Sequence, residues 1–116
     1  IASNDEVVIT MSKEGTTWAL RDENGTSNPP VAEVVSINNG QVTSTIVNNM
    51  IWIIEKNSNN LTFYKDNAKN DWLYCTNTNN GVRVGTNTNK VFTISGNYLR
   101  NTETSRYVGV YVTKPD

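Results

Sequence analysis

The sequence predicts a single domain of the all-β class. Its aliphatic residues are mostly β-branched, with 13 valines and 8 isoleucines against 4 leucines and 4 alanines, and such side chains favour strands. Asparagine (19) and threonine (15) are abundant among the 116 residues, and asparagine suits turns because it tolerates positive φ. Asn-Gly pairs at residues 24–25, 39–40 and 80–81 indicate tight turns, and no stretch sustains a helical period of apolar residues.

Three segments of the chain resemble one another weakly. In each, an aromatic residue follows a strand position at an interval of nine residues: Trp18 after Ile9, Trp72 after Phe63, and Tyr107 after Tyr98. Between them lie polar stretches of equal length that are typical of hairpin loops, residues 12–17, 66–71 and 101–106. The first two segments continue to a closing strand with an aromatic residue inside an aliphatic run, at residues 50–54 and 91–94.

The repeat predicts the strands in order. In the first unit we expect them at about 6–12, 17–22, 31–47 and 50–55, where 31–47 is one long hairpin arm or two short ones that turn at Asn38-Asn39-Gly40. In the second unit we expect them at about 61–66, 71–76, 81–86 and 90–95. The third unit supplies only 97–101 and 106–113.

Four strands repeated three times is the plan of a β-trefoil, in which each unit needs its neighbours to form a core. The units would span residues 6–55, 61–95 and 97–113. The third is incomplete, because the 29 residues that separate Phe63 from Phe92 would carry Tyr98 beyond residue 116. Hairpins stacked in a β-sandwich are the alternative. An incomplete trefoil has open strand edges, so we also expect a homodimer with Arg106–Val112 at or near the contact.

Composition argues against several classes of function. The charge is balanced, with 10 basic and 11 acidic residues, so a basic nucleic-acid footprint is not expected. The longest apolar run, Met50–Ile54, is far too short to cross a bilayer, and no signal peptide is visible in this sequence. There is no histidine, and we expect the single cysteine, Cys75, to be a small buried hydrophobic residue on a strand. With scattered carboxylates and no phosphate-binding loop, we expect neither an enzyme nor a metal or cofactor site.

The segments Trp72–Gly85, Val91–Ile94, Tyr98–Thr102 and Arg106–Tyr111 resemble a β-rich module that recurs in secreted and surface proteins of gut Bacteroidetes. The opening Asp5–Ile9 is similar to the first strand of that module, and the resemblance covers about residues 4–113. Members of the family continue past the position of Asp116 to further strands. The resemblance implies an extracellular or cell-surface location, and a binding or adhesion role.

Carbohydrate recognition is the first function that we expect, since sugar sites pair an aromatic face with polar side chains. The densest such group is Asp71, Trp72, Tyr74, Asn77, Asn79, Asn80 and Arg83. Core packing of Trp72 and a plain asparagine turn are the competing interpretation, and the Gln-x-Trp signature of ricin-type lectins is absent. The alternative function is a structural or protein-adhesion module without glycan binding.

The expected core consists of the inward residues of these strands. They are Ile9, Trp18, Leu20, Val34, Trp52, Ile54, Phe63, Leu73, Val82, Val84, Phe92, Ile94, Leu99 and Val108.

Overall fold

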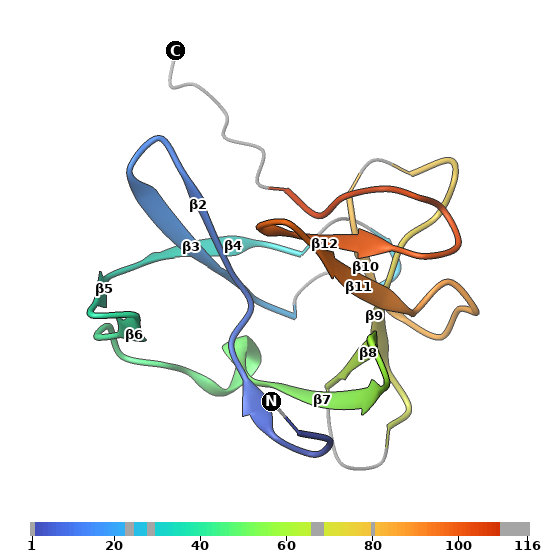
Figure 1. Cartoon of the computed structure of the whole chain (residues 1–116), viewed down its shortest axis with the longest axis horizontal. Coiled ribbons are helices and arrows are strands. Elements are labelled where there is room, and N and C mark those ends of the chain that lie inside the picture. Colours follow the sequence, from blue (N-terminus) through green and yellow to red (C-terminus); the bar gives the residue numbers. More distant parts are fainter. Residues whose placement is uncertain (1, 23–24, 28–29, 66–68, 80, 110–116) are drawn as a thin grey trace.

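A computed structural model describes residues 2–22, 25–27, 30–65, 69–79 and 81–109, and these form an all-β domain (Figure 1). Helical structure within these residues is limited to one 3-10 turn, Asn48–Met50. The strands are β1 (Glu6–Val7), β2 (Thr10–Lys13), β3 (Thr16–Leu20), β4 (Ala32–Val35), β5 (Ile37–Asn38), β6 (Gln41–Val42), β7 (Trp52–Asn57), β8 (Asn60–Tyr64), β9 (Trp72–Tyr74), β10 (Arg83–Gly85), β11 (Phe92–Ser95) and β12 (Tyr98–Asn101). The predicted all-β class is therefore confirmed.

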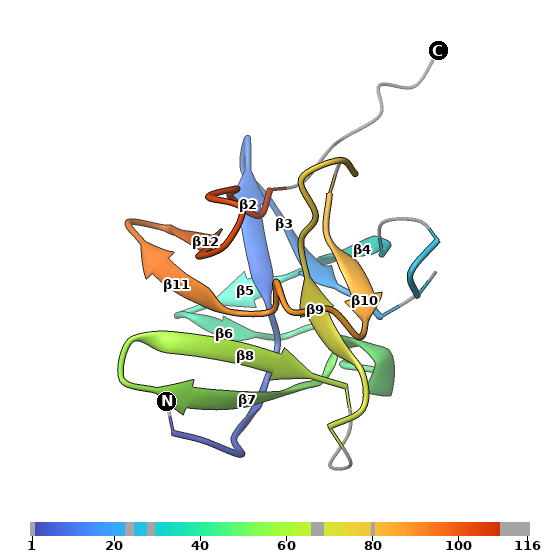
Figure 2. The same cartoon turned by 90° about the vertical axis from the view of Figure 1, so that its right-hand side faces the viewer.

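The strands form three antiparallel sheets. The largest follows the path β1-β7-β8-β11-β12, with β9 paired to β8 and β10 paired to β9. A second sheet is β2-β3-β4, and a third is the β5-β6 hairpin. Figures 1 and 2 show β2–β4 on one side of the molecule, β9–β12 on the other, and the β7–β8 hairpin across one end.

Local sequence accounts for the tight turns. Asn39 and Gly40 both have positive φ, 54° and 78°, and they form the predicted two-residue turn between β5 and β6. Glu14 and Gly15 adopt the same combination between β2 and β3. The other two predicted Asn-Gly turns include Asn24 and Asn80, which lie outside the described residues.

The core has two parts. The main cluster holds eight of the fourteen residues that the sequence places inside: Trp52, Ile54, Phe63, Leu73, Val82, Val84, Phe92 and Val108. Ile9, Trp18, Leu20 and Leu99 are partly buried, and a smaller cluster contains Ala19, Val35 and Met50.

Two predicted core positions are wrong. Val34 is 60% exposed because it lies on the outward face of β4, opposite to the buried Val35. Ile94 is 64% exposed because it faces a groove in which no described strand lies.

The strand pairing puts the ungapped alignment of the three segments one residue out of register. The Leu20 N–H donates to the Ile9 carbonyl and the Val108 N–H to the Leu99 carbonyl, both at 2.9 Å. Tyr64 opposes Trp72, which places Leu73 opposite Phe63. The structurally equivalent pairs are therefore Ile9/Leu20, Phe63/Leu73 and Leu99/Val108. The alignment failed because the three hairpin loops differ in length. Trp18 lies one position before the residue that corresponds to Trp72, and Tyr98 lies one position before the residue that corresponds to Phe63.

Several strands are shorter than predicted. The expected strand 6–12 is divided into β1 and β2, and the expected strand 31–47 into β4, β5 and β6. Of the last expected strand, 106–113, the described part contributes one isolated pairing, Arg100 with Tyr107, and residues 110–113 lie outside the described residues. The five-strand path begins at β1 and ends at β12, with no described strand joining these two. The trefoil arrangement stays a prediction.

Candidate functional site

The outer face of β9 and β10 carries three of the seven predicted binding residues. Trp72, Tyr74 and Arg83 lie on this face, because Leu73 and Val84 alternate with them and enter the core. Tyr74 and Arg83 oppose each other across the two strands. The structure thus places these three side chains on one face of the β9–β10 pair.

Trp72 is only partly available to a ligand. Its indole N–H donates to the Asn87 carbonyl at 2.7 Å, and its ring meets the Tyr64 ring edge to face with centroids 5.8 Å apart. The Lys90 ammonium lies 4.1 Å from the Trp72 ring centroid, so one face of the ring already has a cationic partner. A sugar could stack on that face only after Lys90 moves away.

Tyr74 and Arg83 are buried, at 5% and 7% exposure. The Arg83 guanidinium donates to the carbonyls of Val82 at 3.0 Å and Gly81 at 3.4 Å, so it supports the strand that carries it. Direct contact of either side chain with a ligand at the surface would need a local rearrangement.

Hydrogen bonds from Arg106 hold the loop after β9 in place. Arg106 donates to the carbonyls of Asn79 at 2.5 Å and Asn77 at 2.8 Å, and the Asn79 N–H donates to the Thr76 hydroxyl at 2.8 Å. The Asn77 side chain is exposed and that of Asn79 is half-buried. Asp71 is exposed immediately before β9, and Asn80 lies outside the described residues. Of the six predicted binding residues that the structure describes, those that a surface ligand could reach are therefore Asp71, Trp72, Asn77 and Asn79.

Sequence reasoning missed the lysines around these rings. Lys65 pairs with Asp22 and Lys69 with Glu55, both at 2.8 Å, and their ammonium groups lie 4.9 Å from the Trp52 ring centroid and 5.5 Å from that of Tyr64. The hydrogen bond to Glu55 raises the pKa of Lys69. The signal in the sequence was weak, because Lys90 is far from Tyr64 and Trp72 along the chain.

Cys75 is a buried member of the core, as predicted. Burial raises the pKa of its thiol to about 11, against a smaller opposing effect of Arg106. The thiol is therefore protonated at neutral pH, which is the unreactive form.

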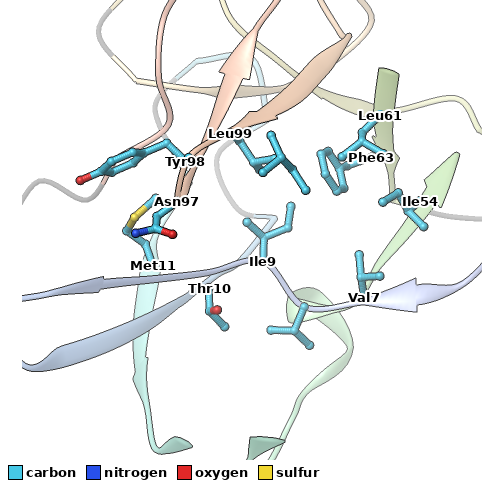
Figure 3. A pocket seen from close by; sticks show the side chains of 13 residues that line it. Val7, Ile9, Thr10, Met11, Ile54, Leu61, Phe63, Asn97, Tyr98 and Leu99 are labelled. Carbon is cyan, nitrogen blue, oxygen red and sulfur yellow. The ribbon is translucent and has the colours of Figure 1, made fainter. Parts of the chain in front are cut away.

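A second candidate site is a groove of about 290 Å³ between the two end strands of the five-strand path (Figure 3). Figure 3 shows Leu99 and Phe63 on one side of the groove facing Ile9 and Val7 on the other. The lining is mainly apolar and comes from residues 7–11, from Ile54, Leu61 and Phe63 on the central strands, and from residues 94 and 96–99. The sequence predicted an open edge, but at Arg106–Val112. Arg106 is instead engaged by the loop after β9, Tyr107 is exposed, and residues 110–112 lie outside the described residues.

The groove exposes a residue whose counterpart is buried. Ile54 opposes Phe63 in the β7–β8 pair, and Ile94 opposes Leu99 in the equivalent β11–β12 pair. Ile54 is 1% exposed, whereas Ile94 is 64% exposed. Ile54 is therefore covered by its neighbours although it borders the groove, whereas most of Ile94 is in contact with solvent.

Within the described ranges, no three histidine, cysteine, aspartate or glutamate side chains gather in a way that could hold a metal ion. In the same part of the chain, no helix is long and apolar enough to span a membrane. Comparison of the chain with protein families, curated proteins and solved structures found no match.

Proposed function

We propose that this domain is a non-catalytic protein-binding module that holds an extended segment of another polypeptide in the groove between β1 and β12. The single observation that carries the proposal is that groove, an apolar hollow flanked by the two end strands of an open sheet. An extracellular or cell-surface location, which the family resemblance implies, belongs to the same proposal.

Strand addition is the binding mode that suits such a surface. End strands offer backbone N–H and C=O groups that an added strand can pair with, and side-chain pockets supply specificity. Ile94 and Tyr98 line the groove and are 64% and 51% exposed, so a bound segment would remove a large apolar area from water.

Carbohydrate recognition at β9 is the second candidate function. The half-buried Trp72 favours it, since this residue directly follows the exposed Asp71, and the Lys90 ammonium over one face of the ring is the group that a sugar would have to displace. A glycan array separates the two functions when Trp72→Ala is compared with the wild-type chain. Binding to a glycan that Trp72→Ala abolishes would support this second function.

A displayed library of random linear peptides tests the main proposal. We expect peptides that bind the wild-type chain and lose roughly tenfold in affinity for Ile94→Lys, because a charge would replace an apolar wall of the groove. Val34→Lys is the matched control, since Val34 is 60% exposed but does not line the groove. Failure to select any peptide that distinguishes the two variants would contradict the proposal.

A further inference from the structure

The turn between β5 and β6 leaves an asparagine side chain and the following glycine nitrogen open to water. The two groups are the carboxamide of Asn39 and the backbone nitrogen of Gly40, and both residues are exposed. Among the residues that the structure describes, neither group has a hydrogen-bond partner. A Cβ added to Gly40 would meet no atom within 4 Å, so the space beside this residue is empty of protein.

The hairpin that carries the turn is held by few contacts. Within the described part of the chain, β5 and β6 pair only with each other, through Ile37 with Val42 and Asn38 with Gln41. Figure 1 shows this hairpin at one edge of the molecule. Short exposed elements of this kind open at a small cost in free energy, without unfolding of the rest of the domain.

Other asparagines in the described ranges differ from Asn39 in their hydrogen bonds or in the residue that follows them. The side chains of Asn87 and Asn101 accept hydrogen bonds from backbone N–H groups, and Asn101 is fully buried. Asn38 is exposed like Asn39, but the residue after it has a Cβ. Glycine lacks this atom, so its nitrogen can approach the preceding side chain with less steric hindrance.

We propose that Asn39 is a site of spontaneous deamidation, a covalent modification that needs only water, since asparagine is among the chemically labile residues. The Gly40 nitrogen bonds to Asn39 Cγ, the bond from Cγ to Nδ2 breaks, and ammonia leaves with the proton that the Gly40 nitrogen gives up. The result is a five-membered succinimide ring. Water then adds to one ring carbonyl: attack at Cγ gives aspartate, and attack at the main-chain carbonyl carbon gives isoaspartate. The reaction is independent of any ligand in the groove.

Either product changes the hairpin. Both carry one more negative charge than asparagine, and isoaspartate also adds a methylene group to the backbone between Asn38 and Gly40. A two-residue turn of this type has one narrow backbone geometry and cannot absorb an extra atom. We therefore expect isoaspartate to disrupt the β5–β6 pairing locally. The smaller core cluster should stay intact, because its buried residues lie on other elements: Ala19, Val35 and Met50.

Peptide mapping by mass spectrometry tests the site. The full chain is incubated at mildly alkaline pH in water enriched in heavy oxygen, so that each hydrolysed succinimide acquires a labelled oxygen. Asn38 is the internal control, because it is the exposed neighbour of Asn39 and lies on the same tryptic peptide. We expect the reaction at Asn39 to be at least about tenfold faster than at Asn38, which corresponds to about 1.4 kcal/mol in the activation free energy.

Two variants separate the chemistry from the fold. Gly40→Ala should slow the reaction at Asn39 by at least about tenfold, because the added Cβ hinders ring closure. The φ of Gly40 is 78°, so alanine strains the turn and favours its opening, and a slower reaction cannot come from a more rigid hairpin. Asn39→Asp adds the charge without the methylene group. Amide hydrogen exchange across residues 36–43 should therefore rise in the isoaspartate form and change little in this variant.

Two results would overturn the proposal. Equal rates at Asn38 and Asn39 would show that the glycine and the open turn give no advantage. A rate at Asn39 in the folded chain more than about a hundredfold below the rate in urea would show that the turn protects this residue.

Discussion

Trp52 is the residue on which the core depends most. Its side chain is fully buried in β7, its indole N–H donates to the Leu20 carbonyl at 3.3 Å, and the Lys65 ammonium lies 4.9 Å from its ring centroid. Removal of a buried tryptophan side chain typically costs about 3–5 kcal/mol, through lost transfer free energy and the cavity that remains. We therefore expect Trp52→Ala to lower the free energy of unfolding by about 3–5 kcal/mol.

The conservative variant Trp52→Phe separates the contribution of the indole hydrogen bond from that of the buried ring. Trp52→Phe keeps an aromatic ring in the core but removes the N–H donor and leaves the Leu20 carbonyl without this partner. A loss of about 1–2 kcal/mol is expected, because one hydrogen bond contributes about 1 kcal/mol and some volume is also removed.

Urea unfolding followed by far-UV circular dichroism measures both variants. Val34→Ala is the control, since an exposed side chain should change stability by less than about 0.5 kcal/mol. The loss expected for Trp52→Ala is a large share of the total, as domains of this kind have a free energy of unfolding of about 5–15 kcal/mol. A loss below about 1 kcal/mol with an unchanged urea dependence would refute the placement of β7 at the centre of the core.

Three further predictions concern single positions. Burial raises the pKa of the Cys75 thiol from its ordinary value of 9.0 to about 11. The protonated thiol therefore contributes its full stabilisation of the folded state below pH 9, and this stabilisation is lost as the pH rises through 11. Between pH 9 and pH 11, the free energy of unfolding of the wild-type chain should fall by on the order of 2 kcal/mol more than that of Cys75→Ala. An equal pH dependence of the two proteins would contradict this prediction. Gly85→Ala should lower the free energy of unfolding by roughly 1 kcal/mol, because the φ of Gly85 is 156° and an added Cβ would lie 2.6 Å from Thr26 Cγ2. In thermal unfolding, the additional substitution Thr26→Ala should restore part of this loss. Asn101→Ala should cost roughly 2–3 kcal/mol in urea unfolding, because the fully buried amide donates to the Asn89 carbonyl and accepts from the N–H groups of Glu103 and Thr104; a cost equal to that of the exposed Asn97→Ala would contradict this.

The features that could be predicted from the sequence are those set by local chemistry. The Asn39-Gly40 turn follows from the positive φ that both residues tolerate, and the burial of Trp52 follows from aliphatic neighbours on both sides. The strand type follows from the excess of valine and isoleucine. None of these depends on contacts between segments that are distant in the chain.

The features that could not be predicted depend on contacts between distant segments. The repeat register failed because a difference of one residue between hairpin loops moves every following side chain to the other face of a strand. Arg83 was expected at a ligand surface, but the guanidinium turns to the carbonyls of Gly81 and Val82. Lys90 covers Trp72 from a segment eighteen positions later in the chain, and no local pattern indicates this contact.

The contrast between Ile54 and Ile94 is the reason that we place the proposed binding surface at the groove rather than at β9. Both isoleucines follow an aromatic residue by two positions and oppose a core residue of the next repeat, so sequence gives them the same environment. In the structure one is buried and the other is 64% exposed. At β9, by comparison, Trp72 already has a hydrogen-bond acceptor, an aromatic neighbour and a cation. A binding partner gains most where apolar groups are still in contact with water, and those groups are Ile94, Tyr98 and the edges that flank them.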